Sequence, residues 1–184
     1  MRKSIVKVGY FPITEVDGAE TYGEIIQLES EKSGGRAYSA APKGELSEVY
    51  ADGRVVYSEE TNDGYDISLT LIDLIDDVAE NWLGRTVDEA GTAEYANANT
   101  PKFGLVIAES TTDGAGEITY YYNCKVNARP TKAGATTEGS FAAQYTEFAI
   151  GARPRAKDML VKYEVAGNTI PAEVPEPAEE GTEG

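Results

Sequence analysis

Alternation of apolar and polar residues is the dominant pattern along this chain. Residues 65–71 carry apolar side chains at every second position, which is typical of a strand with one face buried. Residues 105–108 are apolar throughout, which predicts a buried strand. Residues 117–126 alternate again, with one inward face formed by Ile118, Tyr120, Tyr122, Cys124 and Val126. The pattern therefore predicts a mainly β chain.

Further strands are expected toward both ends. The N-terminal segments 4–11 and 22–30 have strand-like composition. Near the C-terminus the apolar phase changes by one residue, as a β-bulge would require. The residues in phase before the change are Phe141, Ala143 and Tyr145, and those after it are Phe148 and Ile150.

Residues 46–57, LSEVYADGRVVY, predict a β-hairpin with its turn at Asp52-Gly53. These two residues tolerate the positive φ angles that a type I′ turn requires. In an ordinary half-buried hairpin only one face is apolar, whereas residues 49–50 and 55–57 place apolar or aromatic groups on both faces. We therefore expect the second face of this hairpin to be buried against another protein surface.

One stretch has helical spacing. In residues 73–84 apolar side chains recur every three or four positions, with Asp73 as the expected N-cap and Gly84 just past the end. The carboxylates of Asp73, Asp76 and Asp77 crowd the first turn, where the helix dipole favours negative charge. The pattern predicts a helix at about residues 74–83 that packs on the sheet.

These elements predict one β-sandwich or barrel domain over residues 1–163, with one flanking α-helix and a long extended hairpin. Residues 164–184 are rich in Pro and Glu and poor in large apolar residues, so we expect a disordered acidic tail.

Charge and composition narrow the class of protein. The chain has 16 basic and 32 acidic residues, a net charge of −16, and residues 1–162 alone carry −10. Such a surface repels phosphate backbones, which argues against tight nucleic-acid binding.

One Cys and no His argue against metal sites, disulfide scaffolds and imidazole catalysis. An N-terminus without an apolar leader, and the lack of any apolar run of membrane-spanning length, predict a soluble cytoplasmic protein.

The sequence contains few candidate catalytic or metal-binding residues. Cys124 is expected to be a buried small hydrophobe, because it lies mid-strand on an apolar face and has no His partner. Asp76 and Asp77 are neighbours on a helix and point about 100° apart, so they suit dipole compensation better than acid–base catalysis. The Asp-Gly turns lack the ligand spacing of an EF-hand. We expect no enzyme activity, no cofactor and no metal.

Several short motifs occur in a fixed order along the chain: Tyr50-Ala51-Asp52-Gly53, Tyr57, Asn62-Asp63-Gly64-Tyr65, Leu69 with Leu71, Tyr122-Asn123-Cys124, Thr146-Glu147-Phe148 and Pro154. This ordered set resembles the major tail proteins of long-tailed, non-contractile bacteriophages and prophages of Gram-positive bacteria. The resemblance extends from about residue 5 to 162 and rests on the order of the motifs rather than on any one of them. Asp66 and the acidic C-terminus depart from it.

The resemblance implies a tail tube protein that assembles into hexameric rings stacked as a hollow tube, through which DNA passes without specific binding. It implies a location in the virion tail after assembly in the host cytoplasm. It also implies contacts with a tape measure protein and with tail terminator and distal tail proteins. A hairpin arm at about residues 39–62 would reach the next ring, through Val49, Tyr50, Ala51, Asp52, Gly53, Arg54, Val55, Val56 and Tyr57.

Two other classes stay open. A virion decoration or glycan-binding β-sandwich would use its tyrosines as a stacking platform and would stay monomeric or form small oligomers. A carboxylate-based glycosidase would need two convergent acids in a cleft, and no pair in the sequence marks one.

Overall fold

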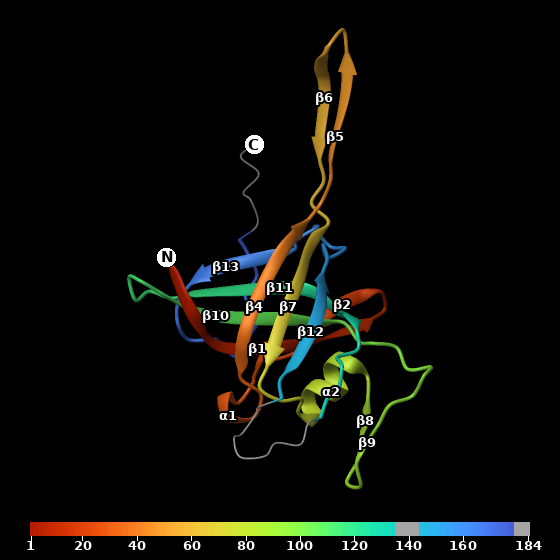
Figure 1. Cartoon of the computed structure of the whole chain (residues 1–184), viewed down its shortest axis with the longest axis vertical. Helices are drawn as coiled ribbons and strands as arrows, with labels where there is room; N and C mark the ends of the chain where they lie inside the picture. The colour runs from red at the N-terminus through yellow and green to blue at the C-terminus, as the bar shows by residue number, and fades with distance from the viewer. Residues whose placement is uncertain (135–143, 179–184) are drawn as a thin grey trace.

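The computed structural model describes residues 1–134 and 144–178 (Figure 1). The described chain is mainly β and carries two helices, of which α1 is a single turn. The elements are β1 (Arg2–Val16), β2 (Ala19–Tyr22), β3 (Ile26–Gln27), α1 (Ser30–Ser33), β4 (Gly35–Lys43), β5 (Leu46–Ala51), β6 (Arg54–Glu60), β7 (Gly64–Leu71), α2 (Asp76–Leu83), β8 (Thr86–Val87), β9 (Thr92–Ala93), β10 (Phe103–Thr111), β11 (Glu117–Ala128), β12 (Thr146–Ala152) and β13 (Lys162–Ala166).

One antiparallel sheet organises the body. Its strand order is β2-β1-β10-β11-β12-β7-β4, while β3 pairs with β1 and β13 pairs with β11. In Figure 1, β1, β10 and β11 run across the body and β4, β7 and β12 run along it, so the sheet bends into two layers. The predicted β-sandwich with a flanking helix is confirmed.

Two hydrophobic cores lie on opposite faces of the β1–β10–β11 layer, which explains the unbroken apolar run in β10. Leu105 and Ile107 belong to the first core, which β7, β12 and α2 complete, whereas Val106 and Ala108 belong to the second. Because both faces are covered, apolar residues are favoured at successive positions. The buried members of the second core are Phe11, Ile25, Val106, Ala108, Ile118, Tyr120, Tyr122 and Ile170.

The predicted single inward face of β11 is wrong beyond Tyr122. Tyr120 and Tyr122 contribute to the second core, but Cys124 and Val126 contribute to the first. The register against β10 changes at this point, since Phe103 pairs with Cys124 and Leu105 pairs with Tyr121. A bulge inserts one residue and reverses the facing of everything after it. The burial of Cys124 is confirmed.

Helix α2 begins later than predicted. Ile75 is extended and occupies the N-cap position, and Asp73 instead accepts a hydrogen bond from the amide of Leu74 at 2.8 Å. Leu74 and Ile75 pack against the first core, which holds them outside the helix. The predicted end is confirmed, because Gly84 is left-handed with φ of 69°. Trp82 fixes the helix to the sheet and stacks on Phe103 with ring centroids 4.7 Å apart.

The N-terminal strands also differ from the prediction. β1 is longer than residues 4–11 and turns at Asp17-Gly18 into β2. The predicted continuous strand at 22–30 is wrong, since Tyr22 ends β2, β3 contains only Ile26 and Gln27, and α1 begins at Ser30. The amide of Ile25 bonds to the carbonyl of Ala172 instead of to a neighbouring strand.

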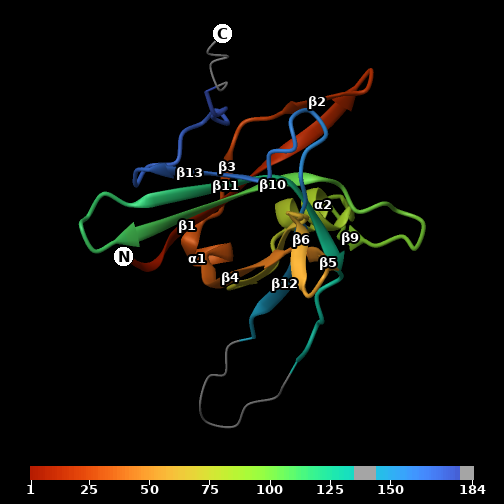
Figure 2. The same ribbon diagram turned by 90° about the horizontal axis from the view of Figure 1, so that it is seen from above.

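The C-terminal region is not the free tail predicted from residue 164. β13 spans that boundary and pairs with β11, and Ile170 is buried in the second core. Figure 2 shows β13 and residues 167–178 on the side of the β1–β10–β11 layer that faces away from β4 and β12. Thus residues 164–178 complete the body, and residues 179–184 lie outside the described residues.

The expected strand near residue 150 is present as β12, with Phe148 and Ile150 buried. Tyr145 precedes it and is exposed. Phe141 and Ala143, on which the predicted bulge depends, lie outside the described residues.

Candidate assembly interface

A two-stranded arm formed by β5 and β6 extends beyond the body (Figure 1). Its turn lies at Asp52-Gly53, where φ is 51° and 79°. Positive φ at both central residues defines the predicted type I′ turn. The sequence-based hairpin is therefore confirmed at its turn and in its pairing, from Leu46 with Glu60 to Ala51 with Arg54.

The arm is shorter than the predicted segment 39–62. Residues 39–43 belong to β4 and pair with β7 inside the main sheet. Hydrogen bonds continue across the junction, from the amide of Asp63 to the carbonyl of Lys43 at 2.8 Å and from the amide of Thr61 to the carbonyl of Glu45 at 2.9 Å. The arm is thus a continuation of the β4–β7 ribbon rather than a loop.

The two faces of the arm carry matching groups. Tyr50 pairs with Val55 across the strands and Val49 pairs with Tyr57, while Val56 is the extra residue of a bulge. Directly paired residues share a face and adjacent residues do not. Each face therefore presents one tyrosine beside one valine.

Each tyrosine is held by a carboxylate on its own face. The hydroxyl of Tyr50 donates to Glu48 at 2.6 Å, and that of Tyr57 donates to Glu59 at 2.9 Å. The bond to Glu48 raises the pKa of Tyr50. Because the hydroxyls are already bonded within the arm, the rings are oriented and their apolar surfaces remain available.

The large apolar side chains of the arm are all exposed to solvent. Their exposed fractions are Leu46 62%, Val49 52%, Tyr50 64%, Val55 42%, Val56 57% and Tyr57 54%. Single exposed apolar residues are common, but a contiguous set on a projecting ribbon indicates an interaction surface. The strand edges of the arm also leave backbone groups free to pair.

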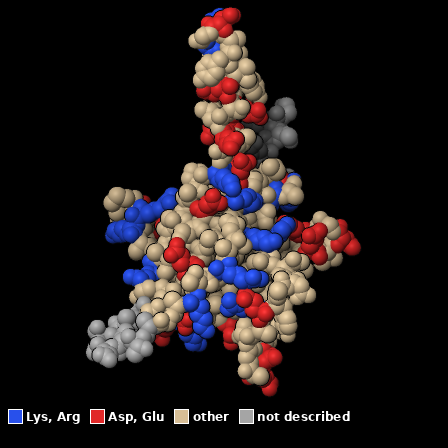
Figure 3. Space-filling view, turned by 45° about the vertical axis from the view of Figure 1, so that its right-hand side comes forward, with Lys and Arg blue, Asp and Glu red and all other residues tan. Residues whose placement is uncertain are grey.

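The charge of the arm is mainly acidic. Between Leu46 and Glu60 it carries Glu48, Asp52, Glu59 and Glu60 against Arg54 alone. Figure 3 shows uncharged surface along the arm between acidic groups. A contact between arms would therefore be repulsive at low ionic strength, and a contact with a less acidic surface is favoured.

The candidate reactive groups are not brought together. Cys124 is fully buried, and burial raises the pKa of its thiol far above the ordinary value. Asp76 and Asp77 are in the first turn of α2. Within residues 1–134 and 144–178, no group of three or more His, Cys, Asp or Glu side chains is placed to hold a metal ion. No helix in the same ranges is long and apolar enough to cross a membrane.

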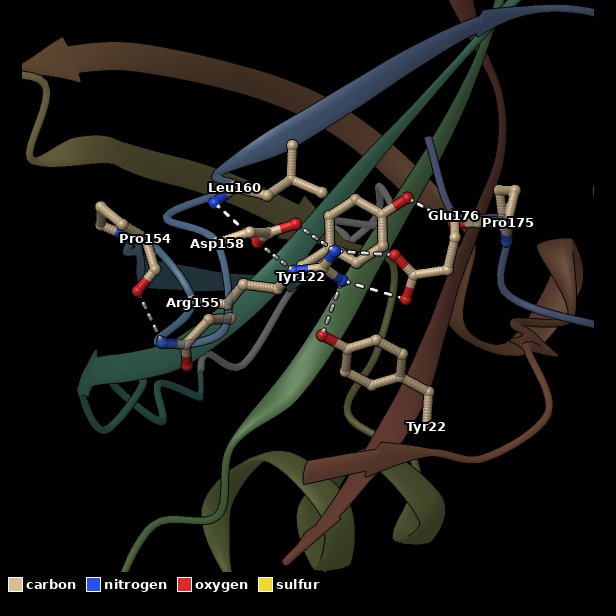
Figure 4. Close-up of polar contacts among 9 residues, drawn as sticks. Tyr22, Tyr122, Pro154, Arg155, Asp158, Leu160, Pro175 and Glu176 are labelled. Atoms are coloured by element: carbon tan, nitrogen blue, oxygen red, sulfur yellow. Dashed lines mark hydrogen bonds and ion pairs between the residues drawn. The ribbon is translucent and has the colours of Figure 1, made fainter. Parts of the chain in front are cut away.

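Sequence reasoning missed an ion cluster around the buried side chain of Arg155, shown in Figure 4. The Arg155 side chain is 3% exposed and bonds to both Asp158 and Glu176. These hydrogen bonds raise the pKa of Arg155 and lower that of Asp158. The spacing of Arg155 and Asp158 is a local signal, but Glu176 lies 21 residues away and its role follows only from the fold.

No protein-family model and no curated protein matches this chain.

Proposed function

We propose that this protein is a tail tube subunit, whose copies form hexameric rings that stack into the hollow tube of a long-tailed, non-contractile phage. The observation that carries the proposal is the arm with apolar groups on both faces. Tyr50 and Tyr57 are each more than half exposed, on opposite faces. In a monomer these exposed apolar groups give no stabilisation by burial, whereas an assembly of copies removes both faces of the arm from water.

The placement of the arm supports an assembly that continues. The arm projects from one end of the β4–β7 ribbon, so a contact between it and another part of a second copy joins different surfaces. Heterologous contacts of this kind generate closed rings or open filaments. Stacked rings combine both outcomes, with the two faces of the arm contacting two different neighbours.

The acidic balance is compatible with a conduit for DNA. The net charge is −16 and offers a polyanion little cationic surface on which to bind. DNA therefore slides through the lumen without specific contacts. A tape measure protein inside the tube, and terminator and distal tail proteins at its ends, belong to the same proposal, as does the location in the virion tail.

Electron microscopy of the concentrated, purified protein tests the proposal directly. Long hollow filaments of stacked rings are expected. A protein that stays monomeric at high concentration and at every ionic strength tried would overturn it. Measurable affinity for glycans, together with a monomeric state, would instead favour a glycan-binding module.

A further inference from the structure

Residues 167–178, here called the strap, cross the second core without forming a helix or strand. Ile170 is buried there, and Val174 packs on the same cluster. Pro171, Pro175 and Pro177 restrict the backbone to extended conformations, which lowers the entropy lost on docking. The strap thus has the composition of a peptide ligand rather than of a sheet strand.

The body holds the strap through backbone carbonyls. Gln27 Nε2 donates to the carbonyl of Ile170 at 3.3 Å, and the Ile25 amide donates to that of Ala172 at 2.8 Å. The hydroxyl of Tyr122 donates to the carbonyl of Pro175 at 2.6 Å. In all three bonds the body supplies the donor, and any extended peptide supplies such acceptors.

The side-chain anchor is Glu176. Its carboxylate accepts two hydrogen bonds from Arg155, at 3.0 Å from Nη1 to Oε1 and at 2.7 Å from Nη2 to Oε2 (Figure 4). Asp158 accepts from Nε and Nη2 of Arg155 at 2.7 and 2.8 Å, and Tyr22 accepts from Nη1 at 3.2 Å. Asp158 and Tyr22 orient the guanidinium, so that Nη1 and Nη2 together face the carboxylate of Glu176.

This anchor is reachable from solvent. The Glu176 side chain is 45% exposed although Arg155 is buried. A hollow of about 600 Å³ lies beside both residues, and its lining also includes Lys102, which pairs with Glu20 at 3.4 Å. A competing carboxylate can therefore approach the guanidinium without unfolding the body.

We propose that the surface under the strap is a peptide-recognition site for an extended, proline-containing segment that carries a carboxylate. The strap is its occupant in the same chain, and the strap of a second copy fits once the first is released. Gly167, with φ of 152°, connects the strap to β13 in a conformation that side chains disfavour. Exchange of an identical segment between copies needs no new contacts.

Amide hydrogen exchange in the full-length protein at low concentration measures strap opening. The Ile25 amide is protected by the strap, whereas the Leu28 amide bonds to Val8 in β1 and serves as an internal control. Glu176→Gln removes the charge from the anchor and should speed exchange at Ile25 about tenfold, with Leu28 unchanged. Glu173→Gln makes the same charge change at an exposed strap position and should leave both amides unchanged.

If exchange at Ile25 is unchanged in the Glu176→Gln protein, Glu176 does not anchor the strap. An equal rise at Leu28 would also do so, because it would indicate opening of the whole body.

Binding of a labelled synthetic peptide of residues 167–178 tests recognition. The peptide should bind the full-length Glu176→Gln protein about tenfold more tightly than the wild-type protein, whose own strap competes. A peptide with Gln at 176 should bind less tightly. No binding to the Glu176→Gln protein, or equally tight binding to the Glu173→Gln protein, would refute the site. None of these readouts depends on tube formation.

Discussion

Gly53 has φ of 79° at the tip of the arm, and a Cβ built there meets no atom within 4 Å. Backbone conformation rather than space therefore restricts this position. Gly53→Val should strain the turn and shorten or abolish tubes, while the circular dichroism of the folded body is retained. Electron microscopy measures tube length.

Gly53→Asn is the matched control, because Asn tolerates the left-handed region. Tubes of wild-type length are expected from it. Normal tubes from the valine variant would remove the proposed role of the tip.

Glu109 is a second residue whose chemistry has a measurable consequence. Desolvation raises its pKa, although Arg2 opposes the rise. The folded state therefore binds this proton more tightly than the unfolded state. The contribution to stability is present below the unfolded pKa of about 4.3 and is lost as pH rises through the folded pKa.

Glu109→Gln should consequently raise the free energy of unfolding at neutral pH, with an advantage that shrinks toward pH 4. Urea denaturation at both pH values measures this. Glu15→Gln, at an exposed position, should show no such pH-dependent gain. A gain that is the same at both pH values would contradict desolvation as the cause.

At the scale of elements, the arm is expected to contribute to association between copies but little to the stability of the fold. Its apolar side chains are exposed, so substitution there should change the free energy of unfolding by no more than about 0.5 kcal/mol. The two faces can also be tested separately, because Tyr50 and Tyr57 lie on opposite sides.

Tyr50→Ser and Tyr57→Ser should each raise the protein concentration needed for polymerisation, since each removes one aromatic contact. Sedimentation of polymer across a concentration series provides the measurement. If only one variant has an effect, the arm uses one face, and the proposal of two neighbours is wrong.

For the whole molecule, net charge opposes the assembly proposed for the arm. Copies with a charge of −16 repel one another, and salt screens this repulsion over a Debye length of about 10 Å at 0.1 M. Added salt should therefore promote tube formation. Light scattering that decreases steadily from low to high ionic strength would count against this balance.

The arm and the strap use different parts of the molecule. The arm continues the β4–β7 ribbon, whereas the strap contacts β1, β3 and β11 on the outer face of the other layer. Variants at Glu176 and at Gly53 are therefore expected to act independently, as distant sites usually do.

The sequence by itself determined the features that depend on local chemistry. The alternation in β7, the turn at Asp52-Gly53 and the helix end at Gly84 each follow from side-chain period or from allowed φ, which a short stretch contains in full. Tertiary structure decided the rest. The bulge before Cys124, the late start of α2 and the docking of residues 164–178 depend on partners such as Leu105, the first core and Arg155. Those contacts bring together residues far apart in the chain, so no local pattern records them.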